Sequence, residues 1–119
     1  MGTPATEWYP QVASLWGKWM DAAAVSEFAK LGYYSMRMPT RAKSAAAVRL
    51  VALNTEHFNH GNEHVLAGET VTLAFEQLCW LNETLTNAGA RGEKAWLFGH
   101  VPPGMVPERP QQRRGAWAG

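Results

Sequence analysis

Two short apolar segments, separated by one long amphipathic segment, constrain this chain more than any other feature of its sequence. The first is VRLVALN (residues 48–54) and the second is KAWLFG (residues 94–99). Apolar runs of this length are typical of strands that are covered on both faces. Between them, apolar residues at steps of three and four predict a helix over residues 71–88. We therefore expect a βαβ unit, with parallel strands and a right-handed crossover.

The apolar spacing of this helix also predicts which of its faces packs against the sheet. Val71, Leu78 and Leu85 lie on one stripe, so we expect that stripe to be buried. Trp80 lies opposite the stripe and needs a partner of its own. Asn82 begins an N-glycosylation sequence, Asn-Glu-Thr, but it lies beside the stripe, so we expect low glycan occupancy.

The N-terminal part of the chain predicts two helices and a further strand. Large apolar residues within residues 6–20 follow helical spacing and predict a buried amphipathic helix. A second helix is expected over residues 22–31, with Asp21 capping its N-terminus and Gly32 at its C-terminal stop. Residues 33–38 predict a strand. The expected fold class is therefore α/β, with N-terminal helices and a strand before the βαβ unit.

Three segments lack apolar periodicity. We expect a polar turn at residues 40–47, a loop at residues 56–68 and a disordered tail at residues 105–119. The loop contains three histidines, His57, His60 and His64. They are either part of a solvated polar loop or, if the loop is ordered, a cluster that lines a site or binds a transition metal.

Composition excludes several classes of protein. The chain has 119 residues, enough for one domain, and 46% of them are hydrophobic, as in folded proteins. The formal net charge is +1 with three arginines in the last eleven residues, so no basic nucleic-acid face is expected.

No apolar run approaches the roughly 20 residues of a transmembrane helix, and residues 1–10 lack the pattern of a signal peptide. The single Cys79 forms neither an internal disulfide nor a cysteine-type zinc site. Most of the six tryptophans fall in apolar patterns and are expected in the core.

The two predicted parallel strands end at the same edge of their sheet, where open α/β folds bind ligands. Asn54 ends the first strand and His100 follows the second. Asn54 either helps to orient His100 through a hydrogen bond or simply caps the chain after its strand. This edge is the predicted site.

The residues at this edge resemble a known family. The resemblance rests on VRLVALNT (residues 48–55), on Gln77 and Trp80-Leu81 in the helix, and on GEKAWLFGHVPPG (residues 92–104). The last segment is similar to the Gly-His-[Ile/Val]-Pro-Pro-Gly motif of the acid sphingomyelinase-like branch of the calcineurin-type metallophosphoesterases. Residues 1–104 are thus identified as a partial domain of that family.

The resemblance implies part of a metallophosphoesterase sandwich that hydrolyses phosphodiester bonds with two zinc ions. The implied substrates are phosphodiester lipids or nucleotide-like molecules, and the implied location is secreted or lysosomal. His100 matches one metal ligand of the family, whereas the family's Asp-x-His and Gly-His-x-His ligand motifs do not occur in these 119 residues. We therefore expect an incomplete zinc site and no activity from this chain alone. The alternative is a noncatalytic binding or regulatory module that retained the α/β scaffold.

Overall fold

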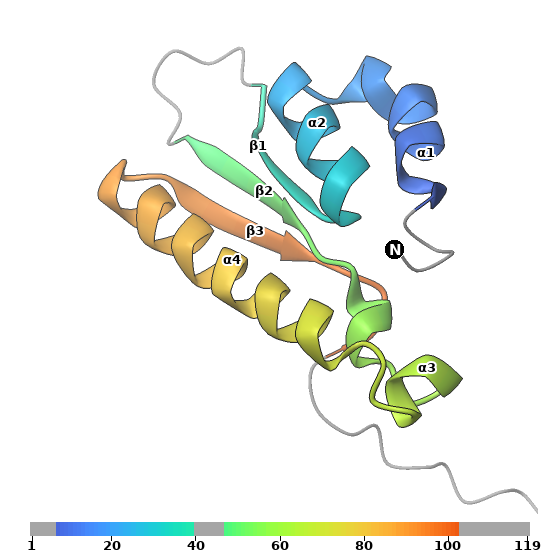
Figure 1. Cartoon of the computed structure of the whole chain (residues 1–119). Coiled ribbons are helices and arrows are strands. Elements are labelled where there is room, and N and C mark those ends of the chain that lie inside the picture. The colour runs from blue at the N-terminus through green and yellow to red at the C-terminus, as the bar shows by residue number, and fades with distance from the viewer. Residues whose placement is uncertain (1–6, 40–46, 103–119) are drawn as a thin grey trace, which may run out of the picture.

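The computed structural model describes residues 7–39 and 47–102 of the chain (Figure 1). In order, the elements are α1 (Tyr9–Trp16), the 3-10 helix η2 (Gly17–Trp19), α2 (Ala22–Leu31), β1 (Tyr34–Arg37), β2 (Val48–Ala52), the 3-10 helix η3 (Thr55–Phe58), α3 (Glu63–Leu66), α4 (Val71–Ala90) and β3 (Lys94–Phe98). The α/β class is confirmed. Most of the turn expected at residues 40–47, the domain boundary at residue 104 and the tail at residues 105–119 lie outside the described residues.

The sheet has three strands in the order β1-β2-β3. β1 is antiparallel to β2, with Tyr34 opposite Ala52. β2 is parallel to β3, with Val48 opposite Lys94 and Ala52 opposite Phe98. α4 connects these two strands and lies along β3, while α1 and α2 lie beyond β1 (Figure 1). The predicted parallel βαβ unit is therefore confirmed.

α2 begins and ends where the sequence predicts. Asp21 Oδ1 accepts a hydrogen bond from the Ala24 backbone N–H at 2.8 Å. Gly32 has a φ of 75°, the left-handed conformation that favours glycine. A Cβ atom at Gly32 would also lie 2.4 Å from Cζ of Tyr9, so glycine is needed for the Tyr9 ring to pack there.

The first helix is shorter and less buried than expected. α1 ends at Trp16, and Ala13 is the only buried residue among the residues of α1 and η2. The two helices of this region meet through Phe28 of α2, whose ring centroid lies 6.0 Å from that of Tyr9 and 5.6 Å from that of Trp16. Leu15 and Trp16 of α1 nevertheless remain 72% and 48% exposed. The expectation of a buried helix over residues 6–20 is wrong for this chain.

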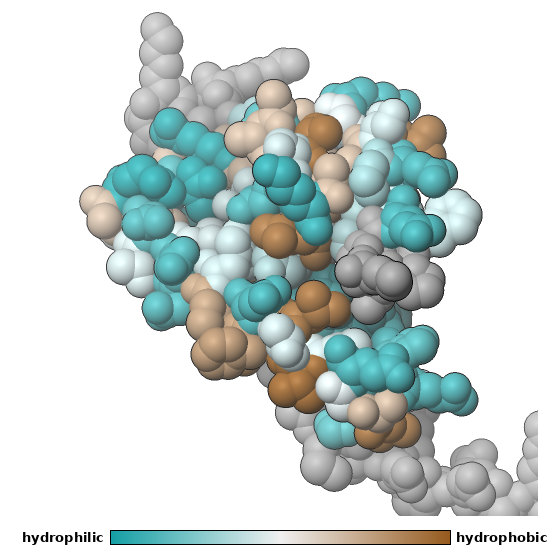
Figure 2. Space-filling view, viewed as in Figure 1, coloured by the Kyte–Doolittle hydropathy of each residue, from teal (hydrophilic) through white to brown (hydrophobic). Residues whose placement is uncertain are grey.

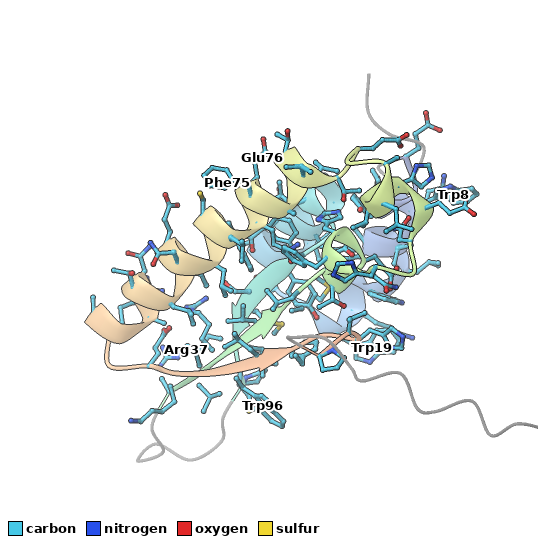
Figure 3. All side chains as sticks on the ribbon, turned by 90° about the horizontal axis from the view of Figure 1, so that it is seen from below. Trp8, Trp19, Arg37, Phe75, Glu76 and Trp96 are labelled. Carbon is cyan, nitrogen blue, oxygen red and sulfur yellow. The ribbon has the colours of Figure 1, made fainter. Side chains whose placement is uncertain are left out.

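α4 confirms the helix predicted over residues 71–88, but a different face of it is buried. Val71 and Leu78, on the stripe expected to be buried, are 65% and 52% exposed. Phe75 is also exposed and points away from the sheet (Figure 3), and Figure 2 shows apolar areas on this outer face. The buried residues of α4 are Gln77 and Ala88. The predicted packing face is therefore wrong, because a polar residue takes the position next to the sheet.

Trp80 packs inward, against partners that the sequence pattern did not identify. Its ring centroid lies 4.7 Å from that of Tyr33, and its Nε1 donates a hydrogen bond to Glu27 Oε1 at 2.6 Å. Glu27 Oε2 accepts a second hydrogen bond from the Ser35 backbone N–H at 3.0 Å. One carboxylate thus joins α2, β1 and α4.

All five residues of β3 are exposed. Trp96 is 60% exposed and projects from the side of the sheet opposite α4 (Figure 3). Four of the five tryptophans in the described residues are exposed in this way, so the expectation that most of them form the core is wrong for this chain. Within the described residues, no helix has the length and hydropathy to cross a bilayer.

Candidate functional site

The ends of β2 and β3 meet at one edge of the sheet, as the βαβ prediction requires. The Leu53 backbone N–H donates to the Phe98 carbonyl at 3.0 Å, which extends the parallel pairing by one residue. Beyond it, the Thr55 hydroxyl oxygen accepts hydrogen bonds from the backbone N–H groups of His100 at 3.1 Å and Val101 at 3.0 Å. The segment that follows β3 is therefore fastened to the segment that follows β2.

His100 lies at this edge with an exposed side chain. Its hydrogen bond to Thr55 uses the backbone N–H, which leaves the imidazole nitrogens out of that contact. Asn54 does not bond to His100 within the described residues. Asn54 Oδ1 instead accepts from the Glu56 N–H at 3.3 Å and caps η3, and Nδ2 donates to the Tyr9 hydroxyl at 3.1 Å. Of the two interpretations of Asn54, the cap is the one observed.

Gln77 clamps the backbone at the end of β2. Its Oε1 accepts from the Asn54 N–H at 2.8 Å, and its Nε2 donates to the Asn54 carbonyl at 3.0 Å. Nε2 also lies 3.2 Å from Nδ1 of His57. Gln77 is only 1% exposed, so these bonds satisfy an amide that water does not reach. Through these bonds α4 holds the end of β2 in place, next to the segment that contains His100.

His57 belongs to this buried polar cluster rather than to a solvated loop. Burial lowers the pKa of His57 below its usual value. Its Nδ1 faces the amide nitrogen of Gln77, and its Nε2 lies 3.4 Å from Nδ2 of Asn54. Because both neighbours are N–H donors, protonation would place a ring N–H against a second donor. The surroundings of His57 therefore favour the neutral ring.

The other two histidines of this segment are exposed and serve different contacts. His64 Nδ1 pairs with Glu69 Oε2 at 2.6 Å, and His60 lies on the surface. No three His, Cys, Asp or Glu side chains come together among the described residues. In the described residues His57, His60 and His64 therefore do not come together as a metal cluster. The loop expected at residues 56–68 also contains two short helical segments, η3 and α3, which are capped by the side chains of Asn54 and Asn62.

The donor set of the described residues does not by itself fit the zinc site of the resembled family. A catalytic zinc ion needs about three protein ligands. His100 offers one imidazole at this edge, and in the described part of the chain it belongs to no group of three His, Cys, Asp or Glu side chains. Neither Thr55 nor Gln77 was assigned a role from the sequence. The signals were a hydroxyl directly after a predicted strand, an amide inside a predicted helix, and the presence of both residues in the segments that carry the family resemblance.

A small cavity of about 110 Å³ lies beside the buried cluster. Its lining residues are Tyr9, Lys30, Leu31, Tyr33, His57, Leu73 and Glu76. Pockets for organic ligands are usually about 300 Å³ or larger, so this cavity is too small for a phosphodiester lipid. The candidate site is therefore the exposed edge and not this cavity.

At the opposite end of the β2–β3 pair, the two strands are joined by an ion pair. Arg49 Nε lies 2.6 Å from Glu93 Oε2, and a second guanidinium nitrogen lies 3.2 Å from Oε1, so the pair is bidentate. The hydrogen bond from Arg49 lowers the pKa of Glu93 and outweighs its burial. This ion pair lies at the edge of the sheet where both strands begin, away from His100.

Known proteins similar to this chain are phosphodiesterases. No protein-family model matches the chain. It is 35% identical over 96 residues to sphingomyelinase phosphodiesterase C from Dictyostelium discoideum, which covers 81% of this chain and 20% of that protein. It is 35% identical over 111 residues to acid sphingomyelinase-like phosphodiesterase 3b from Mus musculus (92% and 22%), and 34% identical over 99 residues to cyclic GMP-AMP phosphodiesterase SMPDL3A from Homo sapiens (83% and 20%).

The chain spans about a fifth of the length of these relatives. The similarity extends over most of this chain and agrees with the resemblance of the segments around Asn54, Gln77 and His100. The chain belongs to the acid sphingomyelinase-like phosphodiesterases.

Proposed function

We propose that this chain forms part of the catalytic domain of a zinc-dependent phosphodiesterase, to which it contributes the metal ligand His100. The observation that carries this proposal is the placement of His100. Its imidazole is exposed directly after a parallel strand, at the edge where ligands of α/β sheets bind. Membership of the phosphodiesterase family supports the same role.

His100 would hold zinc only together with ligands that the described residues do not supply. When bound in such a site, zinc lowers the pKa of a coordinated water and offsets negative charge on a phosphoryl group. The residues of this chain contribute position: β3 carries His100 to the edge, and Thr55 holds its backbone there. The chain alone is therefore expected to be inactive.

The names of the relatives suggest the class of substrate. One group is named for sphingomyelin, a phosphodiester lipid, and another for cyclic GMP-AMP, a nucleotide phosphodiester. Both substrates carry a phosphodiester group flanked by larger organic groups. An exposed edge suits such molecules better than the closed cavity beside His57.

A secreted or lysosomal location is part of the same proposal. Asn82 and Glu83 of the glycosylation sequence are exposed on the outer face of α4, together with Leu78. The reason to expect low occupancy was a buried stripe beside Asn82, and two of its three residues, Val71 and Leu78, are exposed. Expression in a secretory host followed by treatment with a glycosidase would show a mass shift that Asn82→Gln abolishes. No shift would count against this location.

A chimera tests the catalytic proposal. The segment of the mouse 3b relative that matches this chain is replaced by this chain, and zinc content and phosphodiester turnover are measured. We expect His100→Ala to lower turnover by at least about 100-fold and to reduce bound zinc, because an incomplete ligand set holds the ion poorly. The matched control is His60→Ala, which removes an exposed histidine outside the motif and should change neither.

Two outcomes would contradict the proposal. Unchanged turnover and zinc content in His100→Ala would show that His100 is not a ligand. If the chimera without any substitution folds but neither binds zinc nor turns over substrate, the result would favour a noncatalytic module that retained the scaffold.

A further inference from the structure

The Thr55 side chain makes an unusual pair of contacts at the candidate site. Its hydroxyl oxygen accepts from two consecutive backbone N–H groups, those of His100 and Val101, across 45 and 46 residues of sequence. A hydroxyl oxygen has two lone pairs, so these two bonds use its full accepting capacity. One side chain therefore fixes the two peptide groups on either side of the His100 α-carbon.

The methyl group of Thr55 makes a second contact with the same segment. A Cβ atom built on Gly99 would lie 2.6 Å from Thr55 Cγ2, closer than side-chain atoms can approach. Gly99 does not have a positive φ, so its role is to leave room for this methyl group. The hydroxyl and the methyl of Thr55 thus hold three consecutive residues, from Gly99 to Val101.

Thr55 is itself held in place by the residue before it, Asn54, and through Asn54 by α4. It follows Asn54, whose backbone N–H and carbonyl are both bonded to the buried amide of Gln77. Thr55 also begins η3, which the Asn54 side chain caps. A continuous set of bonds therefore runs from α4 through Gln77 and Asn54 to Thr55 and the backbone of His100.

We propose that Thr55 is the positioning residue of this site, which sets where His100 presents its imidazole. The inference rests on the proposed function of His100 for its catalytic meaning, but the contacts exist without it. Thr55 acts through the backbone and touches neither metal nor substrate in this role.

The first test compares Thr55→Val with Thr55→Ser in the full 119-residue chain. Valine keeps the branched shape but removes the hydroxyl, and serine keeps the hydroxyl oxygen. We expect amide hydrogen exchange, followed by NMR, to become about fivefold faster at His100 and Val101 in Thr55→Val and to stay nearly unchanged in Thr55→Ser. The matched control is Thr70→Val, which removes a hydroxyl bonded to the His57 carbonyl at 3.2 Å and should leave the His100 amide unaffected.

The second test uses the methyl contact. Gly99→Ala should disturb the His100 segment in the unaltered chain, because its Cβ meets Thr55 Cγ2. In the Thr55→Ser background that methyl group is absent, so Gly99→Ala should be tolerated and the exchange rates at His100 and Val101 should recover. Equal effects of Gly99→Ala in both backgrounds would overturn the proposed contact.

Turnover in the chimera separates this inference from the proposed function. If both hold, Thr55→Val lowers kcat by about tenfold with KM nearly unchanged, and Thr55→Ser restores kcat. Unchanged exchange at His100 and Val101 in Thr55→Val overturns the positioning role, whatever turnover does. Faster exchange in Thr55→Val, combined with full turnover in His100→Ala, upholds the contact but overturns the catalytic role of His100 and with it the role of Thr55 in catalysis.

Discussion

The two ends of the β2–β3 pair are fastened by different chemistry. Where the strands begin, Arg49 and Glu93 form a bidentate ion pair. Where they end, Gln77, Asn54 and Thr55 bond to backbone groups, and Gln77 and Asn54 also contact the Tyr9 hydroxyl and the His57 ring, without an ion pair. The same two strands thus have a charged end and a neutral end.

This difference has consequences for the metal site that we propose at His100. A fixed carboxylate or guanidinium beside a histidine ligand would change its pKa and compete for the ligand or for a substrate phosphate. Amide and hydroxyl bonds hold the backbone without adding charge. The bonds of Gln77 and Thr55 to backbone groups do not depend on the ionisation of either partner. The neutral end can therefore hold His100 firmly and leave the charge of the site to its ligands.

Removal of Gln77 should have the largest effect on stability. Gln77→Leu leaves the half-buried backbone N–H of Asn54 without its partner and leaves its carbonyl with only the longer bond from the His57 N–H at 3.4 Å, so we expect a loss of about 2 kcal/mol in the free energy of unfolding. Urea unfolding of the full chain measures it. Gln11→Leu is the matched control, because Gln11 is exposed on α1 and its replacement should change stability by less than about 0.5 kcal/mol. Equal losses in both variants would show that the clamp does not support the neutral end.

The βαβ unit was predictable from sequence because its signals are local. Each strand is a short apolar run, and a helical crossover between them favours parallel pairing, with the right-handed crossover that such units adopt. α2 was predictable for a similar reason, since Asp21 and Gly32 mark its ends through their own side chain and backbone. Residues within one or two turns of each other determine these features.

The inner face of α4 was not predictable because it depends on contacts distant in sequence. Periodicity places both Val71 and Gln77 on a helix, and hydropathy alone assigns the apolar one to the core. Gln77 is buried because a backbone segment 23 residues away needs its amide, and Trp80 because Glu27 lies 53 residues away. The role of Thr55 escaped prediction for the same reason, because its partners lie 45 and 46 residues further along the chain.

Disruption of the charged end should have a smaller effect and depend on pH. Because the pKa of Glu93 is lowered from 4.5, its contribution to stability is present above that pH and is lost as the pH falls through the lowered value. We expect Glu93→Gln to cost about 1 kcal/mol at pH 7 and to remove this acid dependence. Thermal unfolding from pH 7 to pH 3 measures both effects, with the exposed Glu83→Gln as control. An acid dependence that persists unchanged in Glu93→Gln would assign it to another group.

The neutral end should show its own, smaller dependence on pH through His57. Its pKa is lowered from 6.5 by burial, so the unfolded chain binds the proton more readily. Stability is therefore full above pH 6.5 and declines as the pH falls from 6.5 through the lowered pKa. His57→Gln should abolish this decline, whereas His60→Gln, at an exposed position, should preserve it. Identical pH profiles for the two variants would count against the buried neutral ring.

The smallest effect on stability is expected at Trp96 in β3, whose side chain belongs to neither the ion pair nor the hydrogen-bonded end of the strands. Trp96 is 60% exposed on the side of the sheet opposite α4, so Trp96→Ser removes little buried area. We expect the free energy of unfolding to change by less than about 0.5 kcal/mol. An exposed apolar side chain on an edge strand promotes association, so the same variant should reduce self-association of the chain in analytical ultracentrifugation. A loss of stability as large as that of Gln77→Leu would show that Trp96 is packed in solution, and that β3 is held by its apolar side as well as by its two polar ends.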